Sequence, residues 1–194
     1  MAYIANQLPE DVFATIQRNA GLLLTEFDPT NWTVNKAHIK GATSGGINFT
    51  DTPSYMDFGE DIDNCPKNTM ELKEIEDREV KVSGTYVAVR PEEIKDLMGA
   101  ADISGTTITP RSSLNPSDFK KLWFVCDYGK DNAIALELDN VLNTSGFALQ
   151  TSDKGKGQFA FEYTAHYSVL APETVPYKFH FKSDVASAAS IGDE

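Results

Sequence analysis

Cysteine is scarce in this chain. Only two of the 194 residues are cysteines, Cys65 and Cys126, and neither lies in a CxxC pair. Two cysteines are too few for the disulfide framework of a small secreted domain. We therefore expect two free thiols, with a single Cys65–Cys126 disulfide as the minor alternative.

Basic residues are also in deficit. The chain has 17 lysines and arginines against 29 aspartates and glutamates, which gives a formal net charge of −12. Tight phosphate binding depends on lysine and arginine releasing counterions, and the chain has no basic block that would do so. An acidic surface repels DNA and keeps a protein soluble. The composition therefore predicts no tight nucleic-acid binding, although DNA can still pass nearby.

Long apolar runs are missing as well. No stretch approaches the roughly 20 apolar residues that a membrane helix needs. The N-terminal sequence MAYIANQLPEDVF has neither the basic region nor the apolar region of a signal peptide. We expect no membrane association and a cytoplasmic place of synthesis.

Motifs of catalysis and metal binding are incomplete. An EF-hand loop started at Asp61 fails because Cys65 and a proline occupy its fifth and sixth positions. The segment 153–157, DKGKG, lacks the pattern GxxxxGK[ST] and indicates a glycine turn between two strands. Ser44 and Ser145 adjoin glycines but do not lie in GxSxG. We expect no enzyme, no catalytic residues, no cofactor and no metal, with a loose cation site in the acidic loop as a minor alternative.

The chain does have the composition of a folded β protein. Hydrophobic residues make up 41% of it, including 11 Phe, 7 Tyr and 2 Trp. Apolar residues alternate with polar ones over residues 79–89, 158–169 and 175–181, which predicts strands with one buried and one solvated face. The faces expected to be buried are Val80, Val82, Gly84, Tyr86 and Ala88; Phe159, Phe161, Tyr163, Ala165, Tyr167 and Val169; and Val175, Tyr177, Phe179 and Phe181.

The expected architecture is a single domain over residues 1–182, followed by a disordered tail over residues 183–194. The fold class is mainly β, an antiparallel sandwich or barrel with one packed α-helix at residues 91–99 and a long inter-strand loop. A second, short helix is expected at residues 8–19. Further strands are expected at residues 22–24, 36–49 with a bend at Gly45-Gly46, 71–89, 122–128 and 133–138.

The long loop is expected at residues 50–69, where prolines and acids gather. Loops of this length in a compact domain are usually functional or disordered. We therefore predict that it contacts other proteins. The candidate contact residues are Thr50, Asp51, Thr52, Pro53, Tyr55, Asp57, Phe58, Glu60, Asp61, Asp63, Asn64 and Pro66.

Several segments together resemble a known family. The block GGINFTDTPSYMDFGEDIDNCPKNT at residues 45–69, followed by REVKVSGTYVAV, is similar to the major tail protein of long-tailed bacteriophages. The similarity is greatest to tail tube subunits of phages with non-contractile tails. Shorter matching pieces are QRNAGLLL, FDP, LWFVCD, GFALQTSD, GQFAFEYTAH and VPY, so the resemblance extends from about residue 8 to residue 181.

The resemblance implies a tail tube fold and an assembly. Subunits would form hexameric rings whose inner sheets surround a lumen, and rings would stack into a tube through which genome DNA passes without being bound tightly. The implied partners are the protein itself, the tail tip initiator, the tape measure protein and the tail terminator. The implied location is the virion tail, after assembly in the host cytoplasm. The lumen-facing residues stay unassigned.

Two alternatives remain open at this point. The tube proteins of type VI secretion and of contractile tails share similar folds, and only the block at residues 46–69 favours the non-contractile group. A β-sandwich that binds a carbohydrate or a host receptor through exposed aromatic side chains is the alternative from a different class.

Overall fold

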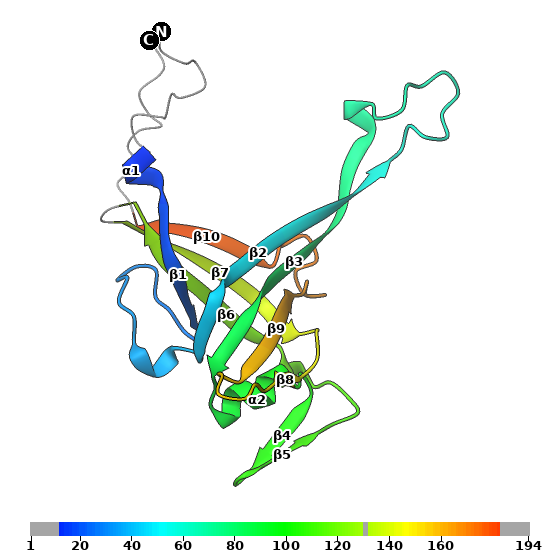
Figure 1. Cartoon of the computed structure of the whole chain (residues 1–194). Coiled ribbons are helices and arrows are strands. Elements are labelled where there is room, and N and C mark those ends of the chain that lie inside the picture. The colour runs from blue at the N-terminus through cyan, green and yellow to red at the C-terminus, as the bar shows by residue number, and fades with distance from the viewer. Residues whose placement is uncertain (1–11, 130–131, 183–194) are drawn as a thin grey trace.

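The computed structural model describes residues 12–129 and 132–182. In chain order, its helices and strands are α1 (Val12–Thr15), β1 (Gln17–Leu24), η2 (Lys36–His38), β2 (Ala42–Asp57), η3 (Met70–Leu72), β3 (Lys73–Ala88), α2 (Pro91–Leu97), β4 (Ala101–Ser104), β5 (Thr107–Pro110), η4 (Pro116–Asp118), β6 (Lys120–Tyr128), β7 (Asn132–Asn143), β8 (Ala148–Gln150), β9 (Gln158–Ala165) and β10 (Tyr177–Lys182). The predicted mainly β fold with a packed helix is confirmed (Figure 1).

One antiparallel sheet forms the body of the molecule. Its strands follow the order β1-β6-β7-β9-β3-β2, with β10 added beside β7 and β8 beside β9. The sheet curls into a barrel that is nearly closed. At one end, Lys40 N donates to Leu23 O and Thr25 N to His38 O, both at 2.8 Å, so the end of β1 lies against the segment leading into β2. A separate hairpin, β4–β5, lies below the barrel beside α2 (Figure 1).

Alternation along the strands produces the core. Val80, Val82 and Tyr86 of β3 are fully buried, and on β9 Phe161 and Tyr163 are 2% and 3% exposed. They pack with apolar residues of β1, β6 and β7 inside the barrel. Fully burying a side chain of this size contributes about 1.5–3 kcal/mol, so the predicted inward faces of these two strands account for much of the stability.

The helix α2 begins where the sequence predicted. Pro91 occupies the first turn, and the Glu93 carboxylate accepts a hydrogen bond from Arg90 N at 2.6 Å. Leu97 is fully buried against the barrel. After α2, Asn143 of β7 donates to Leu97 O at 2.7 Å, which ties the end of the helix to the sheet. The helix therefore closes one end of the barrel.

The expected first helix is mostly wrong. Residues 8–11 lie outside the described residues, α1 has a single turn, and Gln17 already pairs with Tyr128 in β1. Gly21, with φ of +70°, interrupts the register of β1. Pairing with β6 supplies backbone partners along β1 that a lone short helix does not offer.

The expected long loop is wrong over its first half. β2 continues to Asp57 and pairs with β3 over its whole length, from Ala42↔Ala88 to Asp57↔Lys73. Pro53 is tolerated because β2 is an edge strand, where a missing N–H breaks no ladder. The bend at Gly45-Gly46 is confirmed, since both have positive φ and the register shifts between Ser44 and Ile47.

Other boundaries also differ. The expected strand over residues 36–49 begins only at Ala42, because residues 36–38 form η2, and β4, β5 and β8 were not predicted. β9 ends at Ala165, so Val169 lies in a loop and is 92% exposed. On β10, Phe179 and Phe181 are 44% and 54% exposed, so the face expected to be buried is half in water. The predicted tail, residues 183–194, lies outside the described residues.

Candidate functional site

Residues 52–79 form a two-stranded arm that projects from the barrel (Figure 1). β9 pairs with β3 only from Val80 onward, so the first part of β3 has β2 as its one strand partner among the described residues. An isolated two-stranded ribbon is marginally stable in water. Within the chain, its stability therefore depends on the contacts at its root and at its tip.

The tip of the arm, residues 58–72, is internally bonded. The carboxylate of Asp57 accepts from Gly59 N at 2.9 Å and from Asn68 N at 3.0 Å. Phe58 N donates to Leu72 O at 2.9 Å, and Lys73 Nζ donates to the Asn68 side chain at 3.0 Å. These bonds give the tip a defined shape, which a contact surface needs.

The arm exposes apolar side chains and carries much of the charge. Nine acidic residues against three basic ones give residues 52–79 a net charge of −6, half of the −12 of the chain. Large apolar side chains at 41–80% exposure lie among these acids. They are Tyr55, Met56, Phe58, Ile62, Met70 and Ile75. A contiguous exposed apolar surface with a polar surround is typical of interaction sites.

The root of the arm is fastened to β10. Asp51 accepts hydrogen bonds from Arg78 across the hairpin and from the Tyr177 hydroxyl, the latter at 2.7 Å. The Phe49 ring lies 5.4 Å from the Tyr177 ring and 5.5 Å from that of Phe179. These contacts set the direction in which the arm leaves the barrel.

The predicted contact residues therefore fall into two groups. Thr50, Asp51, Thr52, Pro53, Tyr55 and Asp57 belong to β2, whereas Phe58, Glu60, Asp61, Asp63, Asn64 and Pro66 lie in the tip. Within the first group, Asp51 accepts a hydrogen bond at the root of the arm, and Asp57 accepts one within the tip. The remaining side chains are all exposed, except that of Pro53, which is half-buried.

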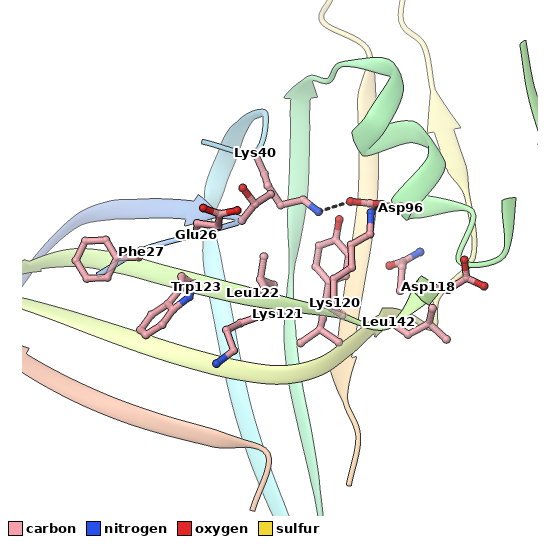
Figure 2. A pocket seen from close by; sticks show the side chains of 14 residues that line it. Glu26, Phe27, Lys40, Asp96, Asp118, Lys120, Lys121, Leu122, Trp123 and Leu142 are labelled. Atoms are coloured by element: carbon pink, nitrogen blue, oxygen red, sulfur yellow. Dashed lines mark hydrogen bonds and ion pairs between the residues drawn. The ribbon is translucent and has the colours of Figure 1, made fainter. Parts of the chain in front are cut away.

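A second feature lies at the opposite end of β2. An open cavity of about 740 Å³ is lined by residues from the β1–β2 connection, α2, β6, β7 and β9 (Figure 2). Phe27, Leu122 and Trp123 line its apolar part, and Lys40 and Lys120 reach Asp96 in its polar part. We call it the lysine cavity.

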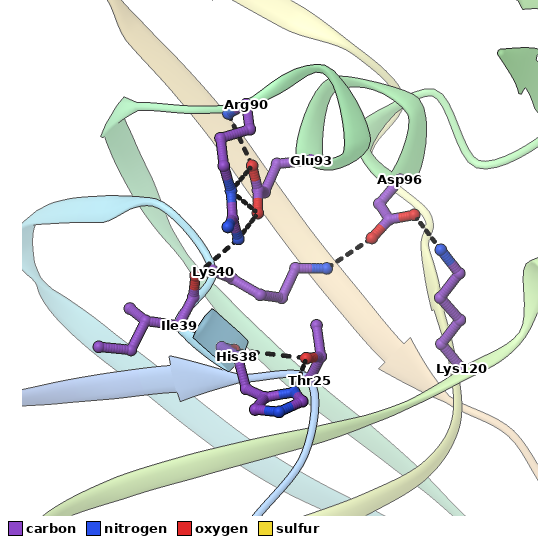
Figure 3. A network of polar contacts seen from close by, with 8 residues as sticks. All are labelled: Thr25, His38, Ile39, Lys40, Arg90, Glu93, Asp96 and Lys120. Carbon is purple, nitrogen blue, oxygen red and sulfur yellow. Dashed lines mark hydrogen bonds and ion pairs between the residues drawn. The ribbon is translucent and has the colours of Figure 1, made fainter. Parts of the chain in front are cut away.

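The polar part of this cavity belongs to a network (Figure 3). Lys40 Nζ and Lys120 Nζ donate to the two oxygens of Asp96 at 2.7 and 2.5 Å. Burial alone would raise the pKa of Asp96, but the two lysines outweigh it and hold that pKa below its ordinary value. Burial would lower the pKa of Lys40, yet Tyr163 and Asp96 raise it. Lys40 therefore stays charged although it is only 5% exposed.

Sequence reasoning missed the lysine cavity. Its charged residues come from four segments far apart in the chain, and none of them lies in a motif. The one available signal was an isolated lysine before a strand, which usually indicates a solvated side chain.

Both cysteines are free thiols, so the alternative of a Cys65–Cys126 disulfide is wrong. Over residues 12–129 and 132–182, no cluster of three or more His, Cys, Asp or Glu side chains is arranged to hold a metal ion. Within the same part of the chain, every helix is too short or too polar to cross a bilayer. Comparison of the sequence with protein-family models and with curated proteins gives no match.

Proposed function

We propose that this protein is a structural subunit that polymerises through stacked hexameric rings into the tail tube of a long-tailed bacteriophage with a non-contractile tail. The tube would conduct genome DNA during ejection. The observation that carries the proposal is the arm, a well-defined acidic ribbon with exposed apolar side chains and no covering element among the described residues.

The sheet supports the same proposal. β2 is an outer strand over its whole length, and β10 and β8 are short additions beside β7 and β9. Unpaired strand edges are ready to pair with another chain unless they are blocked. In a closed ring of identical subunits, edges of neighbours would pair and leave none exposed. The net charge of −12 suits a conduit, because a basic wall would retain DNA.

The first test is negative-stain electron microscopy of the purified chain at high concentration. Rings or hollow tubes are the expected result. A chain that stays monomeric, even with tail tip initiator proteins added, would contradict the proposal. A glycan array would then test the carbohydrate-binding alternative. The tube proteins of type VI secretion and of contractile tails would also give rings. Electron microscopy of the intact phage, which would show a tail without a contractile sheath, separates the non-contractile group from these alternatives.

A shortened arm tests which part assembles. Pro53 and Arg78 are register partners, so residues 54–77 can be replaced by Asn-Gly, a two-residue hairpin turn. The barrel should fold, and polymers should be lost. The matched control replaces residues 151–157 by the same turn between the register partners Gln150 and Gln158. Normal tubes from the arm variant would show that the arm is dispensable.

A further inference from the structure

We propose that the lysine cavity receives the arm tip of a second copy of this chain. This inference rests on the proposed function, since it names the acceptor surface for the arm. It identifies the occupant of the cavity as an acidic hairpin tip with exposed apolar side chains, here residues 58–72 of the neighbour.

The charges of the two surfaces are complementary. The arm tip has four acids, Glu60, Asp61, Asp63 and Glu71, against one base, Lys67. At the centre of the cavity, two ammonium groups share the single carboxylate of Asp96. That centre has one net positive charge in a chain whose overall charge is −12.

The other charged groups around the cavity have partners of their own. Asp118 is held by Arg111 through bonds of 2.6 and 2.8 Å. Lys121 pairs with Glu137 and Asp139. Glu26 lies at the rim, 77% exposed, with His38 at 3.6 Å. The positive charge that an incoming carboxylate meets is therefore confined to the centre formed by Lys40 and Lys120 around Asp96.

Hydrogen-bond donors remain for such a carboxylate. An ammonium group has three N–H donors, and the one hydrogen bond recorded for Lys120 Nζ goes to Asp96. Hydrogen bonds between ammonium and carboxylate are about twice as strong as neutral ones.

The apolar parts also correspond. Beside the lysines, the cavity is lined by Leu122, Leu142 and Trp123, and the Phe27 ring lies 5.6 Å from that of Trp123. The arm tip offers Phe58 and Ile62, each 51% exposed, between its acids. An acidic loop with two apolar side chains thus fits a surface that combines cations with aromatic rings.

The positions of tip and cavity decide what the contact builds. Lys40 lies just before β2 begins, and the tip begins where β2 ends, 16 residues later. At about 3.3 Å per residue, the two are about 50 Å apart, because they lie at opposite ends of the long strand β2 (Figure 1). A tip therefore cannot fill its own cavity. A contact between different surfaces repeats from copy to copy and produces a filament or a stack.

The test exchanges the charges of the two surfaces in the full chain. Lys120→Glu reverses the exposed lysine of the cavity, and Asp61→Lys with Asp63→Lys reverses the tip. Each change alone should raise the concentration needed for assembly at least tenfold by sedimentation velocity. The chain that carries all three should recover most of the loss. Lys156→Glu, at an exposed lysine between β8 and β9, is the matched control and should assemble normally.

A second readout uses the native thiol of the tip. Lys120→Cys should form disulfide-linked ladders with Cys65 of neighbouring copies under mild oxidation, and Lys156→Cys should not. If Lys120→Glu assembles like the control while the tip variant fails, or if only Lys156→Cys cross-links, the arm binds elsewhere and this inference is overturned. If the unchanged chain never associates and Lys120→Cys forms no ladder, the proposed function fails with it.

Discussion

The ion pair between Lys40 and Asp96 predicts unequal costs for two substitutions. Asp96→Asn leaves Lys40, 5% exposed, without a full negative partner, and removal of one partner of a buried pair costs about 3–5 kcal/mol. In Lys40→Met the charge itself leaves the interior, while Asp96 keeps Lys120 at 2.5 Å. Removal of one partner is costly because it leaves the other charge buried and unpaired, and Asp96 is not left unpaired in this variant. We therefore expect a loss of about 1 kcal/mol or less for Lys40→Met.

Urea denaturation followed by tryptophan fluorescence measures both free energies of unfolding, because Trp123 lies in the cavity. In a chain of this length, 1 kcal/mol corresponds to about 2–4 °C in Tm. In thermal denaturation with the same fluorescence signal, Asp96→Asn should therefore lower Tm by about 10 °C, and Lys40→Met by about 3 °C. Asp153→Asn, in an exposed loop, is the control. Equal destabilisation by the two cavity variants would refute the reasoning.

The same pair predicts a pH dependence. The pKa of Asp96 is lower in the folded chain than in the unfolded one, so the unfolded state binds its proton first as pH falls. The ionised carboxylate of Asp96 contributes its full stabilisation above its pKa in the unfolded chain, which is about 3.9. This stabilisation is lost as pH falls through the lower pKa of Asp96 in the folded chain. The difference in unfolding free energy between the unchanged chain and Asp96→Asn should therefore shrink below about pH 4. A constant difference from pH 5 to pH 2 would contradict this account.

Two further predictions concern single sites. Gly21→Ala should lower the free energy of unfolding by about 3 kcal/mol in urea denaturation, because φ is +70° and the added Cβ would lie 2.3 Å from the Phe124 ring. Gly45→Ala is the control: its φ is +83° but the space around it is open, so the loss should be only about 1 kcal/mol. Equal losses for the two variants would exclude the steric cause. Burial raises the pKa of the Cys126 thiol to about 11, so at pH 8 a maleimide should label Cys65 first, as read by mass spectrometry of peptides. Labelling of both thiols at one rate would contradict the burial of Cys126.

Sequence patterning identified the elements whose one face is buried. Val80, Val82 and Tyr86 alternate with polar residues and are fully buried, and the helix over residues 91–97 has its proline and acids in the first turn. The same rule failed for β10, whose Phe179 and Phe181 alternate with polar residues but stay half exposed. Alternation shows that one face of a strand is apolar and the other is polar. Whether the apolar face is covered depends on where the rest of the chain places the neighbouring strands.

The arm explains why the largest error fell at residues 50–57. No side chain of residues 50–57 is buried, so burial within the chain does not select for alternation there. The prolines and acids of this segment indicate a loop. Backbone pairing with β3 holds the strand all the same, from Thr50↔Lys81 to Asp57↔Lys73. A strand that keeps exposed Tyr55 and Met56 without a core beneath them exposes costly apolar surface in the free subunit. The proposed assembly would bury that surface, so the segment that patterning misread is also the one to which the proposal assigns the contact.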